Sequence, residues 1–386
     1  MVRKASLTDR FKVLQLQLHF NSNISGLAEQ IVRALPADRF EVTTAFLSGR
    51  PEPQDIESCA PRSIYFNFKK TDLKGLKRFR ALRHLYKHCR NERYDVIIAH
   101  RFKPMDMLML INKGLTIPVC IGVQHGSGDF DRFLRRVGAR LLLKPNWKTV
   151  GVSRSVCDYL ISCRAGFNSK NTVRINNAID IDWAERVQLS REHARAELGL
   201  DAGAFILGCI GRLVPIKGHI FLIEALSRIQ KNYPDVQVAI IGEGRARQKL
   251  ERAIDNYGLH GRVHLLGARE NALQYVRAFN AFVMPSLDEG LPLALLEAMS
   301  GHLPVVGSDI DSLKSILEDS GGRIFTVKKV DSLTETLEKL LNATADEHRL
   351  EGERAYAYLC ENHNIDDFRR QYRELLEELL HVGGAA

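Results

Sequence analysis

Two cations in the second half of the chain have the types and the spacing that phosphate binding requires. In the segment GCIGRLVPIKG, an apolar run typical of a buried strand ends at Gly211, Arg212 follows, and Lys217 comes five positions later, just before a predicted helix. Open α/β sheets bind ligands at the carboxyl ends of their strands. Arginine can grip phosphate oxygens bidentately and lysine adds a point charge, so the pair could neutralise a pyrophosphate without a metal ion. Two solvated loop cations are the alternative.

Two glutamates in the segment DEGLPLALLEAM have a spacing that suits a nucleotide sugar. Seven residues separate Glu289 from Glu297, and a helix is predicted to begin near Pro292. If the intervening residues were all helical, the two carboxylates would lie roughly 12 Å apart, which is comparable to the span from a sugar ring across a pyrophosphate to a ribose. Backbone N–H groups of Gly290 and Leu291 would then meet the phosphates. Alternatively, one glutamate offsets the helix dipole and the other is a surface residue.

Strand-like and amphipathic helical segments alternate along the chain, which predicts an α/β fold with parallel sheets. Most of the strands are continuous apolar runs, as expected of strands covered on both faces. In the first half they are predicted at 12–19, 40–47, 94–100, 117–125, 148–153 and 173–177. In the second half they are predicted at 205–211, 236–242, 263–266, 281–284, 304–308 and 323–327.

A chain of 386 residues suits two such domains. The pattern lapses between Asp180 and Gly203, where residues 183–200 form a charged helical stretch. We therefore predict one domain at 1–182, a linker region at 183–203, a second domain at 204–364 and a terminal helix at 365–386. The apolar face of that helix needs a partner surface, for which the first domain is a candidate; its residues are Phe368, Tyr372, Leu375, Leu376 and Leu379.

Four linked motifs between residues 204 and 318 resemble the donor domain of the retaining GT-B glycosyltransferases of family four. They are GRLVPIKG, AIIGEG, VHLLG and MPSLDEGLPLALLEAMSGHLPVVGSD, in that order. The resemblance implies two Rossmann-like domains facing a cleft, with a nucleotide sugar bound to the second domain. It also implies that Arg212 and Lys217 hold the donor phosphates, that Glu297 bonds the ribose hydroxyls and that Glu289 contacts the transferred sugar. The base would lie over a segment that begins at Leu266 and Gly267 and ends at Arg269.

The first half resembles the acceptor domain of that family more loosely. Ser25-Gly26 is similar to its glycine-rich first loop, His125 to its active-site histidine, and INNAID, which contains Asn177, to its interdomain segment. His100, at the end of another predicted strand, is a second acceptor-side candidate. Either histidine could instead be structural.

Three departures from the family pattern put the contacts to sugar and acceptor in doubt. The first loop has one glycine instead of a pair, and Ala178 stands where glycine is common. After Asp309, IDSLKSILED replaces the usual glycine-rich turn and glutamate.

Nothing in the sequence favours a metal ion or a cofactor. The D-x-D pairs at 129/131, 180/182 and 309/311 each border a predicted helix start, where aspartate caps free N–H groups. Gly242-Glu243-Gly244 falls short of a dinucleotide fingerprint. Seven scattered cysteines without C-x-x-C spacing are expected to be reduced, structural thiols.

A net charge of +9 suits an anionic partner. The most basic stretch, residues 69–90, begins at Lys69, ends at Arg90 and is predicted to be an amphipathic helix. A second basic cluster interleaves with apolar residues at 132–144. Both could dock on an anionic membrane or a phosphorylated glycolipid, although a helix packed on the core with a solvated face would show the same pattern. We find no signature of a nucleic-acid-binding module.

Residues 1–10 are polar and do not resemble a signal peptide, and no apolar run is long enough to span a membrane, so we expect a cytoplasmic protein at the inner membrane face. The hypothesis is a retaining, metal-independent hexosyltransferase that uses a nucleoside diphosphate sugar, preferably UDP-linked. Its acceptor would be a glycan or glycolipid, with lipopolysaccharide core preferred. A GT-B sugar-nucleotide epimerase, a basic nucleic-acid-binding protein and an inactive nucleotide-binding scaffold are the alternatives.

Overall fold

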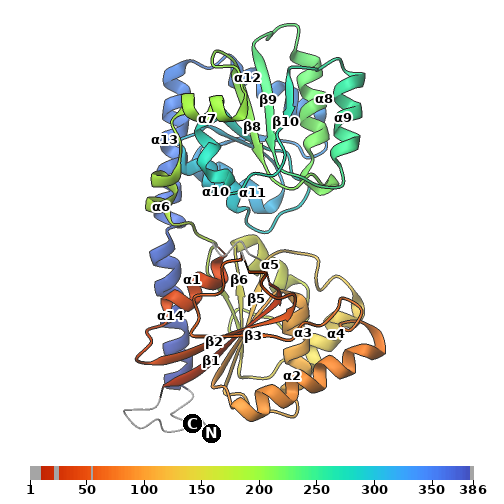
Figure 1. The fold of residues 1–386 in the computed structure, drawn as a ribbon, viewed down its shortest axis with the longest axis vertical. Helices are drawn as coiled ribbons and strands as arrows, with labels where there is room; N and C mark the ends of the chain where they lie inside the picture. The colour runs from red at the N-terminus through yellow and green to blue at the C-terminus, as the bar shows by residue number, and fades with distance from the viewer. Residues whose placement is uncertain (1–9, 21–25, 54, 383–386) are drawn as a thin grey trace. The chain divides into compact units, whose positions relative to one another are not determined.

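The computed structural model describes residues 10–20, 26–53 and 55–382, which form two compact units (Figure 1). Unit 1 contains the residues up to Asn177 and those from Asp366 onward, and unit 2 runs from Ala178 to Ile365. Nearly all of the polar amino-terminal segment lies outside the described residues, and so does Ser25 of the first loop.

Unit 1 is built on a seven-stranded parallel sheet with the strand order β3-β2-β1-β4-β5-β6-β7. Its central strands are almost fully buried because helices cover both faces, and Val13, Ile97 and Ile121 have no exposed surface. The strands are β1 (Phe11–His19), β2 (Phe40–Ser48), β3 (Arg62–Tyr65), β4 (Val96–His100), β5 (Val119–Gln124), β6 (Trp147–Gly151) and β7 (Thr172–Arg174).

Six α-helices and one 3₁₀ turn accompany this sheet. They are α1 (Leu27–Ala34), η1 (Gly75–Lys77), α2 (Arg78–Glu92), α3 (Phe102–Ile111), α4 (Phe133–Leu142), α5 (Arg154–Ser162) and the carboxyl-terminal α14 (Ile365–Val382). The predicted apolar face of α14 is buried, except that Leu379 is half-buried. Arg369 on α14 donates to Gln30 on α1, at 3.0 Å from Nε, so the helix lies along α1 (Figure 1).

Unit 2 contains a six-stranded parallel sheet with the order β10-β9-β8-β11-β12-β13. Leu207 and Val238 of the sheet share one hydrophobic cluster with Leu226 on α8 and Leu337 on α12. The strands are β8 (Phe205–Ile210), β9 (Val236–Ile241), β10 (Val263–Leu265), β11 (Ala281–Met284), β12 (Val305–Ser308) and β13 (Arg323–Phe325).

The helices of unit 2 include both helices of the segment that joins the two sheets. They are α6 (Ile181–Val187), α7 (Arg191–Leu198), η2 (Pro215–Lys217), α8 (His219–Ile229), α9 (Arg247–Asn256), η3 (Ala272–Ala278), α10 (Leu293–Ser300), α11 (Asp311–Ser320), α12 (Val330–Leu341) and α13 (Ala345–Asn362). The single charged helix expected at 183–200 is thus two helices. Ser190 ends the break between them by accepting a hydrogen bond from the His193 N–H, which caps α7.

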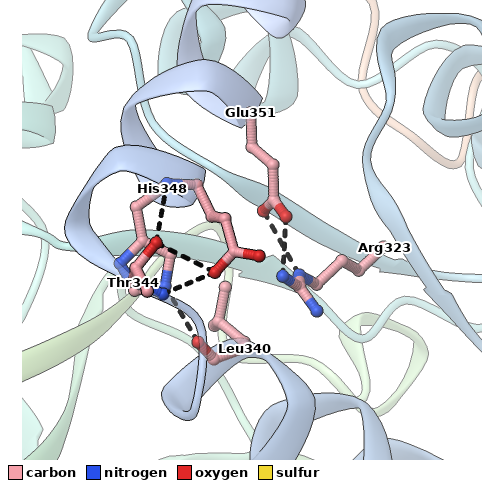
Figure 2. Close-up of polar contacts among 6 residues, drawn as sticks. Arg323, Leu340, Thr344, His348 and Glu351 are labelled. Carbon is pink, nitrogen blue, oxygen red and sulfur yellow. Dashed lines mark hydrogen bonds and ion pairs between the residues drawn. The ribbon is translucent and has the colours of Figure 1, made fainter.

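Figure 2 shows how the amino-terminal end of α13 is fixed in unit 2. Thr344 and Glu347 form a reciprocal capping box, and His348 bonds to the carbonyl oxygen of Leu340 at 2.8 Å. Glu351 receives two hydrogen bonds from Arg323 on β13. These contacts anchor the helix to the sheet edge.

The structure confirms the α/β class and all twelve predicted strands, and it adds β3. This four-residue strand pairs only with β2 at the edge of the sheet, and none of its residues is buried. Its sequence therefore lacks the continuous apolar run that marks the other strands.

The prediction of one amphipathic helix over 69–90 is wrong at its start. The α-helix begins at Arg78, after a 3₁₀ turn, and the residues before Gly75 are not helical. Leu76 and Phe79 of the expected apolar face are 85% and 68% exposed, whereas Leu73 is buried. In the part of the chain that the structure describes, no helix combines the length and apolarity that crossing a bilayer requires.

Candidate active site

The loop after β8 presents both predicted phosphate-binding cations. Arg212 is exposed two residues beyond the strand, and Lys217 closes η2. Gly218 then adopts a left-handed φ of 67°, and a Cβ there would lie 1.8 Å from the carbonyl oxygen of Pro285. Only glycine fits this position, and it turns the chain into α8. The backbone thereby fixes Lys217 beside Gly211, whose added Cβ would lie 3.8 Å from the lysine Cε.

Lys217 forms an ion pair with Glu289 in the structure. The Lys217 Nζ atom lies 2.5 Å from Glu289 Oε1, and both side chains are largely shielded from solvent. Ser286 donates a second hydrogen bond to the same carboxylate oxygen at 2.7 Å. Ser286 itself follows β11 and is buried. A cation from the β8 loop and a carboxylate from the β11 loop therefore meet at the carboxyl edge of the sheet.

The AIIGEG motif is explained by close backbone packing. An added Cβ on Gly242 would lie 1.9 Å from the Gly211 carbonyl oxygen, and one on Gly244 would lie 2.4 Å from that of Leu213. The Gly242 N–H donates to the Gly267 carbonyl at 2.8 Å, and the Leu266 N–H donates to Ile240 at 3.0 Å. The segment predicted to contact the base, which begins at Leu266 and Gly267, is thus hydrogen-bonded to Gly242. Gly242 in turn packs against Gly211, the residue before Arg212.

Glu297 lies on α10 but not at the separation that a continuous helix would give. The helix begins at Leu293 with Pro292 as its cap, so Glu289, Gly290 and Leu291 precede it, and the estimate of roughly 12 Å does not apply. Burial raises the pKa of the Glu297 carboxyl group to about 7. Among the described residues, no side chain forms a hydrogen bond or ion pair with this carboxyl group. It is a shielded acid whose hydrogen-bonding capacity is available to a ligand.

The two predicted histidines meet in unit 1. His100 ends β4 and His125 follows β5, and because these strands are neighbours their ring centroids lie 5.8 Å apart. Each Nε2 atom is buried and has no hydrogen-bond partner among the described residues. Burial and nearby Arg101 lower the pKa of His125 to about 4, and burial, His125 and Arg101 hold the pKa of His100 well below its usual value. Both rings are therefore neutral near pH 7.

The remaining candidates in unit 1 are Gly26, predicted to bind the donor, and Asn177, predicted on the acceptor side, and both occupy structural positions. Gly26 caps α1 through its backbone, with φ −61°. Asn177 is buried, and its N–H donates to the Val152 carbonyl at 3.1 Å, at the point where the chain leaves unit 1.

The aspartates of the D-x-D pairs have different roles, and the prediction that each pair caps a helix is only partly right. Asp180 caps α6 by accepting from the Trp183 N–H at 2.9 Å. Asp129, in contrast, lies 3.6 Å from the Arg135 guanidinium, and Asp309 accepts from the Val327 N–H at 2.8 Å. Within the described ranges, no three His, Cys, Asp or Glu side chains are grouped as metal ligands. All seven cysteines are free thiols.

Sequence reasoning missed three residues at the two sheet edges. Ser286 has a signal in retrospect, since it lies three residues before Glu289 on the same loop. Arg101 follows β4 with φ 67° and ψ 167°, which is a strained conformation for a residue with a side chain. No sequence pattern predicts this conformation. His19, at the end of β1, hydrogen-bonds to Ser48 through its Nδ1 atom.

The protein has two units with parallel sheets, and in unit 2 cations and acids meet in the loops after β8 and β11. These features are typical of α/β transferases that use a sugar nucleotide. Residues 190–358 match the model of the glycosyl transferases group 1, and residues 27–183 match that of glycosyltransferase family 4. Together these models span most of the chain. The protein belongs to the group 1, family 4 glycosyltransferases, which are GT-B enzymes, and it is a hexosyltransferase that uses a nucleotide-sugar donor.

Two named relatives match at low identity over most of their length. The chain is 24% identical to the UDP-Gal:alpha-D-GlcNAc-diphosphoundecaprenol alpha-1,3-galactosyltransferase of Escherichia coli, over 87% of this chain and 91% of that protein. It is also 24% identical to the lipopolysaccharide core biosynthesis mannosyltransferase LpsB of Rhizobium meliloti, over 94% and 96% of the two chains. The crystal structure of HepE from Anabaena in complex with UDP and glucose has the same fold, with a TM-score of 0.78, 19% identity and coverage of 95% and 100%.

Proposed function

We propose that this protein transfers a hexose from a UDP-sugar to a hydroxyl of a glycan or glycolipid acceptor, with retention of anomeric configuration and without a metal ion. The observation that carries the proposal is the group formed by Lys217, Glu289 and Ser286, with Arg212 and Glu297 on the adjoining loop and helix. The cations of this group can bind a diphosphate, and its acids can bind hydroxyl groups. A nucleotide sugar carries both a diphosphate and hydroxyl groups.

Each residue of the donor site has a role that follows from its chemistry. Arg212 and Lys217 bind the diphosphate, and Glu297 accepts hydrogen bonds from the ribose hydroxyls. Glu289, already oriented by Lys217 and Ser286, contacts the transferred sugar. Gly290 and Leu291, just before α10, direct backbone N–H groups and the helix dipole toward the phosphates.

Charge that develops on the leaving diphosphate is the main electrostatic problem of the transfer. Arg212 and Lys217 stabilise it from fixed positions, since the turn at Gly218 holds the lysine before the donor arrives. We favour a front-face reaction in which the leaving phosphate helps to deprotonate the acceptor hydroxyl.

The acceptor belongs to unit 1, where His125 is the candidate that contacts the reacting groups. A neutral imidazole can donate or accept a hydrogen bond to a sugar hydroxyl without adding positive charge. The names of the two relatives support a lipid-linked or envelope glycan as acceptor. One relative acts on a diphosphoundecaprenol-linked sugar, and the other acts in lipopolysaccharide core biosynthesis. We favour lipopolysaccharide core.

We further propose that unit 1 docks on an anionic membrane, as a peripheral protein at the inner face of the cytoplasmic membrane. The docking surface comprises η1, the start of α2 and, most of all, α4. Ala139 is the only buried residue of α4, whereas Phe133, Leu134 and Leu141 are 68%, 82% and 72% exposed. Arg132 and Arg140 flank them, an arrangement typical of interfacial helices. Both α2 and α4 pack against α3 (Figure 1).

The slow hydrolysis of sugar nucleotides in the absence of acceptor tests the donor proposal. The parent protein is incubated with UDP-, GDP- and ADP-hexoses in excess EDTA, and NMR follows the products. We expect release of free sugar from a UDP-hexose, with the α-anomer formed first if configuration is retained from an α-linked donor. Calorimetry of UDP binding should show that Glu297→Gln weakens binding by about 1–3 kcal/mol.

Three outcomes would contradict the proposal. A preference for GDP- or ADP-hexoses would show that the donor is not UDP-linked. Activity that requires manganese would contradict the proposal that Arg212 and Lys217 neutralise the diphosphate without a metal ion. Conversion of the donor into an epimeric sugar nucleotide, without release of sugar, would identify an epimerase.

A further inference from the structure

An excess of cations gathers at the carboxyl edge of the unit 1 sheet, next to the histidine pair. Lys70 and Lys74 precede α2, and Arg101 and Lys103 lie at the start of α3. Arg78 is the first residue of α2, and Arg135 lies in the first turn of α4. Burial lowers the pKa of Lys103, and the charges of Arg78, Lys74 and Arg135 lower it further, whereas Asp106 raises it, so these groups lie near one another. Such an arrangement is unfavourable unless an anion neutralises it.

Only two of these six cations have a carboxylate partner. Arg78 pairs with Asp106 at 2.5 Å, and Arg135 pairs with Asp129 at 3.6 Å while its guanidinium lies 4.1 Å from the centre of the Phe102 ring. Among the described residues, Lys70, Arg101 and Lys103 have no acidic partner. The two pairs hold Arg78 and Arg135 in place and leave the other cations available.

Arg101 is the centre of this group. Burial is the main cause that lowers the pKa of His19, His100 and His125, and the charge of Arg101 adds to it in all three, so its guanidinium lies close to the ends of β1, β4 and β5. Its backbone is held at φ 67° by a hydrogen bond of 2.8 Å from its N–H to Val123. The Arg101 side chain is exposed and has no acidic partner among the described residues, so its guanidinium is available to an anion.

Polar groups that could complete an anion site converge here. The first N–H groups of α3, at Phe102 and Lys103, have no carbonyl partner within the helix because they belong to its first turn. There is no acidic residue in that turn. The buried Nε2 atoms of His100 and His125 also lack partners among the described residues. Cations, helix N–H groups and neutral imidazoles are together the donor set of a phosphate site.

We propose that Arg101, Lys103 and Lys70 bind a phosphate group carried by the acceptor. This inference rests on the proposed function, because it takes unit 1 to hold the acceptor, and it narrows the acceptor class to phosphorylated or diphosphate-linked glycans. Arg101 and the start of α3 grip the phosphate, and His100 and His125 lie beside it, where the neighbouring sugar hydroxyl would be. A neutral glycan would leave the cations unpaired.

Inorganic phosphate tests the site directly, in the presence of saturating UDP so that the donor site is occupied. The titration is followed by the NMR signals of the histidine rings. In the parent, phosphate should shift the His19 signal and raise its pKa, because the anion offsets the nearby cations. Lys103→Gln and Arg101→Gln should each weaken phosphate binding at least tenfold.

Lys113→Gln is the matched control, since it removes an exposed lysine just beyond the other end of the same helix. Equal phosphate affinity in Lys103→Gln and Lys113→Gln would overturn the proposal. A lipid headgroup could supply the same chemistry, so phosphatidylglycerol vesicles form a second arm. If the Arg101 and Lys103 variants lose vesicle binding but the parent shows no phosphate-dependent shift of His19, the cations bind headgroups and the acceptor assignment is wrong. Hydrolysis of UDP-hexose by the parent tests the proposed function separately.

Discussion

The carboxyl edges of the two sheets differ in whether their cationic side chains have acidic partners. In unit 2, Lys217 is already paired with Glu289, and the loops around it approach so closely that Gly218, Gly242 and Gly244 admit no side chain. In unit 1, Arg101 and Lys103 have no acidic partner among the described residues, and apolar side chains on the nearby α4 remain exposed. The first edge is preformed, whereas the second presents cations and apolar side chains for which we propose a ligand and a membrane surface.

This difference indicates how the two halves of a glycosyltransferase are constrained. The nucleoside diphosphate is the constant part of the donor, so a rigid backbone frame can hold the residues that bind it. Acceptors vary, and side chains on helices can change without disturbing the sheet. The comparison predicts that changes to the backbone frame of unit 2 have large effects, and that changes on the exposed face of unit 1 affect binding alone.

The largest effect is expected from Gly218→Ala. Its Cβ would collide with the Pro285 carbonyl and the residue would keep a left-handed φ, so we expect a loss of roughly 3 kcal/mol in the stability of unit 2 and loss of UDP binding. Gly199→Ala is the control, because it has a similar φ of 65° but nothing within 4 Å of the new Cβ, and it should cost only about 1 kcal/mol. Thermal unfolding and calorimetry measure both. Equal losses would mean that close packing does not hold this loop.

Removing the Lys217 charge should mainly affect turnover. Lys217→Met should lower kcat by about 100-fold, because the developing charge on the diphosphate loses a fixed cation. Lys249→Met, on the exposed side of α9, should behave like the parent. Steady-state kinetics with a UDP-hexose decide between them. Unchanged kcat in the Lys217 variant would show that this lysine serves only to position Glu289.

The exposed apolar residues of α4 offer a test of unit 1 that leaves its core intact. Phe133→Gln combined with Leu134→Gln should weaken sedimentation with phosphatidylglycerol vesicles at least tenfold, since each side chain buries apolar surface worth about 1.5–3 kcal/mol in the interface. The melting temperature should not fall, because both residues are exposed. Leu350→Gln on α13 is a control with a partly exposed leucine. A drop in melting temperature without a change in sedimentation would contradict membrane docking.

Charge reversal of the basic residues sharpens the same comparison. Replacing Lys74, Lys77, Arg80 and Arg83 by glutamate should abolish vesicle binding and leave UDP binding unchanged, and parent binding should fall as salt screens the exposed charges. Arg78 is excluded because its ion pair with Asp106 ties α2 to α3. Sedimentation that is insensitive to salt would argue against an electrostatic contribution.

The smallest effect concerns Glu297 and pH. Burial raises its folded-state pKa from the ordinary 4.5 to about 7, so between these values the folded protein holds a proton that the unfolded chain has released. The free energy of unfolding should therefore fall as the pH rises from 4.5 to 7. Glu297→Gln should flatten this slope, whereas Glu318→Gln, at an exposed site, should leave it as in the parent. Chemical denaturation across this pH range measures it, and identical slopes would place the carboxyl group in contact with water.

Most of the fold could be predicted from the sequence because buried parallel strands leave a local mark. Twelve of the strands were predicted, most of them from continuous apolar runs, and β3 was missed because an edge strand need not be apolar. The donor residues Arg212, Lys217, Glu289 and Glu297 could be proposed because they lie near glycines and strand ends within two short segments. Their roles in binding and catalysis stay predictions.

Tertiary structure alone decided which apolar side chains are buried and which charged side chains have partners. Periodicity cannot distinguish a face that packs on the core from one that remains exposed, so Leu73 is buried while Leu76 and Phe79, on the same predicted face, are not. Likewise, Arg101 lies near three histidines because β1, β4 and β5 end at one edge of a parallel sheet, although these strands are far apart in sequence. The sequence determined which elements form, because that depends on local patterns of residues. Which charges meet depended on strand order, which no local pattern encodes.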